Sequence, residues 1–189
     1  MTTTTTVPTG VTTGTWTIDA SHSEATFTVR HAGISKVRGS VAITEGTVVI
    51  GEDLTTSSVT ATLDPSTINT RDEGRDGHLR SADFFEVETY PTWTFTSTSV
   101  RGDEDGYVIT GDLTIHGVTR SVELETEFNG AAVDPFGNRR IGFSAVTEIS
   151  RKDFGLTWNV ALEGGGLLVG DNVKISIEIA GVQRLARVS

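Results

Sequence analysis

Apolar and polar residues alternate with a period of two along most of this chain. One run places Ala25, Phe27 and Val29 at every second position, and His31 continues the series. Because strand side chains point to the two faces in turn, this spacing predicts a strand with one apolar face, toward which His31 also points. The same alternation marks six further runs, at residues 59–63, 93–96, 107–115, 122–128, 141–149 and 175–179. The pattern predicts a strand-rich chain.

Turn signals separate these runs. The clearest are Gly102–Gly106, His116–Gly117, Asp134–Asn138 and Gly164–Gly166, where the residues that favour turns gather. The spacing gives about eight strands, as in a barrel or a sandwich. A closed barrel keeps one face of every strand dry and removes exposed edges. We therefore predict an all-β antiparallel barrel of about eight strands, just wide enough to be filled by side chains or to hold one slender ligand.

One segment departs from the strand pattern. Residues 75–85 combine charges, a histidine and paired aromatic residues, and Asp76 is a candidate cap for a short helix from Gly77 to Phe84. The preceding stretch, Asp64–Thr70, is expected to be a turn that leads into the helix. We expect this helical segment to lie near one end of the barrel and to cover its mouth.

The length of 189 residues fits one all-β domain. The polar, repetitive start predicts a disordered threonine-rich tail over residues 1–13, followed by a β-barrel domain over 14–184 and a C-terminal tail over 185–189. The sequence starts with neither a basic nor an apolar leader, which predicts a cytoplasmic protein. No apolar run approaches the roughly 18 residues of a membrane span.

The net charge and the absence of cysteine exclude several classes of partner. The formal net charge is −10, whereas nucleic-acid binding needs a basic surface, so we expect no nucleic-acid partner. The same balance argues against electrostatic binding to anionic lipid surfaces. The chain has no cysteine, and its four histidines show no metal-binding spacing, so neither a metal nor a cofactor is expected.

The apolar faces of the strands supply candidate ligand contacts. They would line the lumen with Phe27, Val29, Trp93, Phe95, Leu113, Ile115 and Phe143. The alternative is that these side chains fill the barrel as an ordinary core. Phe84, Phe85 and Trp158 would border the mouth, where they suit a homodimer contact or a membrane encounter equally well.

Polar candidates lie at the same end. His31, Arg75 and His78 could face the polar head group of a ligand. For His31, the alternative is a buried histidine bonded to a neighbouring hydroxyl or carbonyl group. For the helical segment, the alternative is an ion-pair network among its charged residues, namely Arg75, Asp76, Arg80 and Asp83.

Four blocks of sequence, in order along the chain, resemble the YceI-like family. They are Trp16-x-Ile18-Asp19-x-x-His22-Ser23, then Arg75-Asp76-x-His78-Leu79-Arg80-Ser81-x-Asp83-Phe84-Phe85, then Gly111-Asp112-Leu113-Thr114-Ile115-x-Gly117, and Ser150-Arg151-x-Asp153-Phe154-Gly155. The resemblance implies a lipocalin-like, eight-stranded antiparallel barrel that binds polyisoprenoid lipids, such as isoprenoid quinones or prenyl diphosphates, in its lumen. It adds Phe154 of the last block to the expected ligand contacts.

Three functions follow as hypotheses. The first is a protein that binds a long apolar isoprenoid lipid for carriage, storage or sequestration. The second is an enzyme of the cyclase or isomerase type, with His31, His78 and Asp153 as acid or base candidates, which would require two of them to converge on one site. The third is a structural or stress-related scaffold without a ligand. The sequence favours binding, because it shows no recognisable catalytic constellation.

Overall fold

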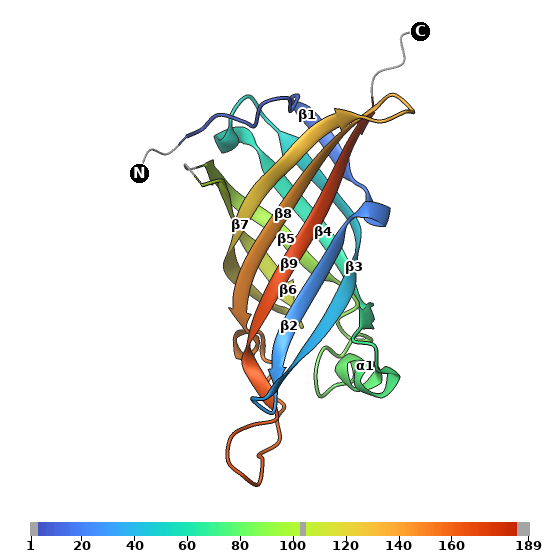
Figure 1. The fold of residues 1–189 in the computed structure, drawn as a ribbon, viewed down its shortest axis with the longest axis vertical. Helices are drawn as coiled ribbons and strands as arrows, with labels where there is room; N and C mark the ends of the chain where they lie inside the picture. Colours follow the sequence, from blue (N-terminus) through green and yellow to red (C-terminus); the bar gives the residue numbers. More distant parts are fainter. Residues whose placement is uncertain (1–3, 103–104, 185–189) are drawn as a thin grey trace.

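The strands form one antiparallel sheet that closes into a barrel (Figure 1). A computed structural model describes residues 4–102 and 105–184 of the chain. The strands in this part are β1 (Gly14–Ile18), β2 (Glu24–His31), β3 (Ser35–Ile50), β4 (Ser58–Asn69), β5 (Trp93–Gly102), β6 (Tyr107–Ile115), β7 (Val118–Val133), β8 (Asn138–Ser150) and β9 (Val169–Arg184). Its helical segments are α1 (Glu73–Arg80) and the 3-10 turns η1 (Ala20–His22), η2 (Leu54–Thr56) and η3 (Arg151–Phe154).

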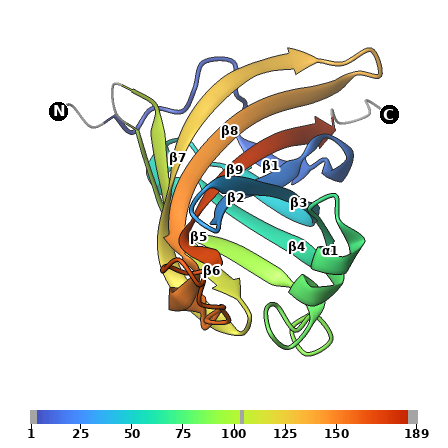
Figure 2. The same ribbon diagram turned by 60° about the horizontal axis from the view of Figure 1, so that its bottom comes forward.

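Strands β2 to β9 make the closed ring. Each pairs with its neighbour in sequence, and β2 pairs with β9 to join the two ends. Strand β1 pairs with β3 and β9 beyond the end of β2, so it prolongs β2 around the turn η1. Figure 2 shows the strands arranged around the central axis. The predicted eight-stranded antiparallel barrel is confirmed, with β1 as a ninth, short strand.

Strand β3 was not among the alternating runs, and its structure explains why. Its register against β4 shifts between Ser40 and Ala42 and again between Ile43 and Glu45. The second shift places an extra residue on β3, so the apolar series of Val41 and Ile43 continues out of phase at Val48 and Ile50. At the first shift the extra residues lie on β4. The same shifts accompany the extension of β4 to Asn69, which makes the expected turn at Asp64–Thr70 wrong. The buried Pro65 sits beside this irregular pairing, where a strand tolerates a residue without an N–H group.

Residues 4–13, expected to be a disordered tail, lie across the end of the barrel opposite α1 (Figure 1). The backbone of Thr4 pairs with Gly102, and the carbonyl group of Thr12 accepts a hydrogen bond from the Trp16 indole over 3.1 Å. Val7 and Val11 pack against the buried cluster around Trp16. This segment therefore contributes to the core at that end. Residues 1–3 and 185–189, also expected to be tails, lie outside the described residues.

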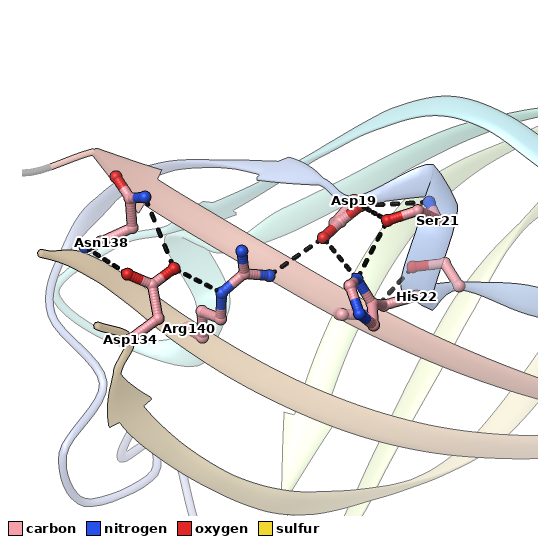
Figure 3. A network of polar contacts seen from close by, with 8 residues as sticks. Asp19, Ser21, His22, Asp134, Asn138 and Arg140 are labelled. Atoms are coloured by element: carbon pink, nitrogen blue, oxygen red, sulfur yellow. Dashed lines mark hydrogen bonds and ion pairs between the residues drawn. The ribbon is translucent and has the colours of Figure 1, made fainter. Parts of the chain in front are cut away.

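A polar network joins η1 to the β7–β8 turn at this end of the barrel (Figure 3). The Arg140 guanidinium donates to Asp19 over 2.9 Å and to Asp134 over 2.7 Å. Asp19 also accepts from Ser21 and contacts the His22 ring. These hydrogen bonds lower the pKa of the Asp19 carboxyl group, and backbone and Arg140 hydrogen bonds lower the pKa of Asp134 to about 2. The network fixes the hairpin outside the barrel lumen.

Candidate ligand cavity

A cavity of about 260 Å³ runs inside the barrel, and its walls are almost wholly apolar. The inward faces of the strands line it, because the period-two alternation turns their apolar side chains to the axis. Nine of the expected contact residues line this cavity: Phe27, Val29, Phe84, Phe85, Trp93, Phe95, Leu113, Ile115 and Phe143. The lumen is therefore partly filled by side chains and partly open.

The cavity is long relative to its volume. It extends from Val7 and Leu54 at one end to Leu79 of α1 at the other. Along β9 its lining runs from Val169 to Ile179. At a rise of about 3.3 Å per residue and a tilt of roughly 40°, that stretch spans on the order of 25 Å along the barrel axis. The space suits a slender, extended ligand and excludes a bulky one.

Several lining residues were not predicted. Val41, Ile43 and Val48 come from the bulged strand β3, and Val7 comes from the expected tail. Val41 and Ile43 continue an alternation that starts at Val37 and that the prediction left out, whereas Val48 lies out of phase with it, beyond the bulge. The β3 residues pack in the clusters at the two ends of the barrel.

A buried arginine lies at the α1 end of the cavity. Arg151 of η3 is 4% exposed, and its guanidinium donates to the carbonyl groups of Leu156 over 2.7 Å and Gly170 over 3.0 Å. Burial lowers the pKa of this side chain, and the charge of Asp171 opposes that shift. Because its donors already have carbonyl partners, Arg151 holds the end of the barrel together and offers little to a ligand.

The indole N–H of Trp93, a residue of the lining, has no hydrogen-bond partner among the described residues. Trp93 is 7% exposed, and its Nε1 atom is buried without a hydrogen-bond partner. The ring packs against Phe85, with ring centroids 4.7 Å apart, in the cluster beside α1. An unsatisfied buried donor costs about 1–3 kcal/mol. The Nε1 atom itself is closed off from the cavity, so an acceptor on a ligand reaches it only after a small shift of the neighbouring side chains.

Helix α1 begins four residues earlier than predicted. Asp72, not Asp76, caps it and accepts a hydrogen bond from the Arg75 backbone. Asp76 is buried instead, and its carboxylate accepts from the backbone and the hydroxyl group of Thr70. The sequence around Asp72 carries the same capping signal, since Glu73 follows in the first turn. The helix ends at Arg80, and further turns continue through residues 81–89.

The charged side chains of α1 bind the main chain of β4 and its end. Arg75 donates to the hydroxyl and carbonyl groups of Thr70, both over 2.8 Å, and Arg80 donates to the carbonyl group of Ser66 over 2.9 Å. Neither side chain forms an ion pair with a carboxylate in the described part of the chain. The alternative of an ion-pair network is therefore wrong, although these arginines do fix the helix to the barrel.

His78 lies in an aromatic cluster outside the cavity. Its ring meets Phe84 edge-on with centroids 5.0 Å apart and Trp158 with centroids 4.7 Å apart, and its Nε2 atom lies 2.8 Å from the Asp83 carboxylate. Phe84 reaches the cavity lining, whereas His78, Arg75 and Trp158 do not. These contacts connect α1 to the loop after η3.

His31 and Phe154 also lie outside the lining. His31 is the last residue of β2, and the cavity lining along this strand stops at Val29. Phe154 is buried in the core cluster with Trp93. The enzyme hypothesis required acid and base groups at one site, yet none of His31, His78 and Asp153 lines the cavity.

Two further properties of residues 4–102 and 105–184 bear on function. In these ranges, no three histidine or carboxylate side chains gather where they could hold a metal ion. Helix α1 and the 3-10 turns all fall short of the length and apolarity that a membrane-spanning helix needs.

Sequence comparison identifies the family. The family model of the YceI-like domain matches residues 16–181, nearly the whole barrel. The chain belongs to the YceI-like domain family. A UPF0312 protein of Staphylococcus aureus (strain MSSA476) is 39% identical over 165 residues, which cover 84% of this chain and 92% of the relative. The resemblance carried by the four sequence blocks is thereby confirmed.

Solved structures share the architecture. The Campylobacter jejuni YceI protein is 29% identical with a TM-score of 0.63, and the match covers 82% of this chain and 90% of that one. Burkholderia cenocepacia BcnA is 20% identical with a TM-score of 0.71, over 86% and 98% of the two chains. A polyisoprenoid binding domain from Saccharophagus degradans is 17% identical with a TM-score of 0.58, over 88% and 97%. The last two show likeness of fold alone.

Proposed function

We propose that this YceI-like protein binds a long apolar isoprenoid lipid in the barrel cavity, for carriage, storage or sequestration. The single observation that carries the proposal is the long, narrow, apolar cavity. Each Å² of lipid surface that enters it gains roughly 25 cal/mol from removal from water. The family membership and the described polyisoprenoid-binding activity of the Saccharophagus degradans domain support the same ligand class.

The polar contacts favour a neutral head group inside the barrel. A diphosphate would need unpaired cations or several free donors around it. The lining is almost wholly apolar: the donors of Arg151 face carbonyl groups, and the unpaired N–H of Trp93 lies buried just behind the cavity surface. One donor matches one neutral acceptor, such as a quinone carbonyl oxygen. A prenyl diphosphate would have to keep its head outside, near Arg75 and His78.

A cavity-blocking variant tests the proposal. Ala145 lines the middle of the cavity against Phe95, whereas Ala132 of β7 is exposed on the outside. After incubation with ubiquinone and gel filtration, organic extraction of wild type and of Ala132→Phe should yield the lipid. Ala145→Phe should retain far less, while its circular dichroism stays that of a folded barrel. Equal retention by all three proteins would show that the lipid binds elsewhere.

The binding hypothesis outweighs the enzyme hypothesis, because the acid and base candidates do not converge on the cavity. A cytoplasmic location, a role in stress and a homodimer stay predictions. Cell fractionation, survival of a deletion strain under oxidative stress and sedimentation velocity would test them one by one.

A further inference from the structure

Four of the fifteen basic residues of this acidic protein lie side by side on one part of its outer surface. All three lysines, Lys36, Lys152 and Lys174, lie toward the end of the barrel that carries α1. On neighbouring strands, Thr28 of β2 pairs with Arg38 on one side and with Lys174 on the other, and Arg30 pairs with Lys36. These four cations are exposed and point away from the lumen. We call Arg30, Lys36, Arg38 and Lys174 the basic patch.

The four cations of the basic patch outnumber the acidic residues that pair with them across the strands. None of its four members forms an ion pair with another described residue. The exposed Glu148 of β8 pairs with Lys174 across the strands and is the acidic residue next to the patch. Farther along the same outer face, Glu24 and Glu178 pair with each other, so the face changes from basic to acidic away from α1. The net charge of −10 therefore hides a local basic surface.

Exposed apolar side chains project beyond the basic patch. Ile34, in the turn between β2 and β3, is 87% exposed, and Val160 and Leu167 of the loop before β9 are 47% and 50% exposed. The backbone of Ala32 donates to Leu168, and Leu168 donates to Val160, so the turn and the loop are joined. Figure 1 shows this loop projecting farthest at the lower end of the barrel. We call Ile34, Val160 and Leu167 the apolar tip.

The loop that carries the apolar tip is held in shape by its own hydrogen bonds. The Asn159 side chain bonds to both the N–H and the carbonyl group of Val169 at the base of the loop. Nearer the end, Leu162 and Gly166 pair through their backbones. Because the backbone is already fixed, insertion of the exposed side chains into another phase costs little ordering entropy.

We propose that the apolar tip and the basic patch dock this end of the barrel on an anionic lipid membrane. Apolar side chains enter the boundary between head groups and acyl chains, while long cationic side chains reach the head-group phosphates. Residues Lys36 and Arg38 lie two and four positions from Ile34, within roughly 13 Å along an extended strand. Attraction to anionic head groups acts over about that distance. Acidic side chains of this end, among them the exposed Glu73, Asp83, Asp153 and Glu163, oppose the attraction and set an upper limit on the affinity.

The inference goes beyond lipid binding in the cavity, and it is tested with vesicles that contain no isoprenoid. Purified protein is sedimented with vesicles of equal parts phosphatidylglycerol and phosphatidylcholine, and with vesicles of phosphatidylcholine alone, at low salt and at about 0.15 M salt. We expect binding to the anionic vesicles only, weakened by salt. Absence of binding to anionic vesicles at low salt would overturn the proposal, whatever the cavity binds.

Matched variants separate a docking surface from bulk charge. Reversal of two charges in Lys36→Glu/Arg38→Glu should lower the bound-to-free ratio by about tenfold or more, since each cation near an anionic surface contributes roughly a fivefold effect. Arg101→Glu/Arg139→Glu, with the same change of net charge near the other end, should bind as wild type does. Ile34→Ser should weaken binding. Phe136 lies in the β7–β8 turn at the other end and is 86% exposed, so Phe136→Ser should leave binding unchanged. If the two charge-reversal variants lost vesicle binding equally, or if Ile34→Ser and Phe136→Ser did, the assignment of the docking surface to this end would be contradicted.

Discussion

The indole N–H of Trp93 gives a prediction whose size follows from the structure. Trp93→Phe removes the donor and keeps an aromatic ring against Phe85. In the empty protein the change relieves a buried unsatisfied N–H, which costs about 1–3 kcal/mol, and loses packing around the smaller ring, an opposing cost of similar size. We therefore expect the free energy of unfolding without ligand to change by less than about 2 kcal/mol.

The effect on binding should depend on the ligand. A hydrogen bond typically contributes a net free energy of about 0.5–1.5 kcal/mol. The Trp93 N–H has no partner in the empty protein, so it loses no hydrogen bond when a ligand binds. The gain should lie near the upper limit, so Trp93→Phe should weaken binding of a ligand with a carbonyl acceptor by about tenfold. A hydrocarbon isoprenoid such as squalene has no acceptor, and its affinity should change only through packing.

A competition assay measures this difference directly. Each protein is equilibrated with a mixture of short-chain ubiquinone and squalene in detergent, separated by gel filtration and extracted, and the bound ratio of the two lipids is quantified by mass spectrometry. Trp93→Phe should lower the quinone-to-squalene ratio about tenfold. Trp158→Phe, outside the cavity lining, should leave the ratio unchanged. An unaltered ratio in Trp93→Phe would refute the role of the indole as a donor to the ligand.

Three further predictions concern stability. Hydrogen bonds lower the pKa of Asp134 from 3.8 to about 2, so the stability that its carboxylate contributes is full above pH 3.8 and is lost as pH falls through 2. Asp134→Asn should therefore lower the melting temperature at pH 7, and the difference from wild type should shrink below pH 3.8 and vanish below pH 2. Asp76→Ala leaves the buried Thr70 N–H and hydroxyl groups without their acceptor and should cost about 1–3 kcal/mol in urea unfolding, whereas Asp76→Asn, which keeps an oxygen, should cost less. Arg151→Leu removes the hydrogen-bond donors to the carbonyl groups of Leu156 and Gly170. Each unsatisfied carbonyl group should cost about 1–3 kcal/mol, so the α1 end should be destabilised by a few kcal/mol. Hydrogen exchange should then be faster in η3 than in the rest of the barrel, before global unfolding.

The strands and most of the cavity wall could be predicted because both follow from one physical rule. Side chains alternate across a strand, and a closed barrel turns one set inward, so Phe95 and Leu113 were placed correctly from spacing alone. The rule fails where a bulge shifts the register. It therefore missed Val48, which lies beyond the extra residue that β3 carries between Ile43 and Glu45. Alternation also does not say where the cavity ends, and the lining stops at Val29, short of His31.

Local signals were harder to place because several residues of the same type compete for one role. Asp72 and Asp76 are both plausible helix caps, and only the packing of Thr70 against α1 decides that Asp76 is buried. The unsatisfied Trp93 N–H has no sequence signal at all. Whether an indole finds an acceptor depends on which groups from distant strands reach its edge in the folded barrel.

Native mass spectrometry of the protein, purified gently from a bacterial host, tests the central claim most directly. The account predicts a retained adduct that organic extraction identifies as a prenyl lipid with a neutral oxygen-bearing head group, and that Ala145→Phe loses. A bare polypeptide mass, unchanged after incubation with quinones and prenyl diphosphates, would contradict it and would show that the space inside the barrel is not a lipid site.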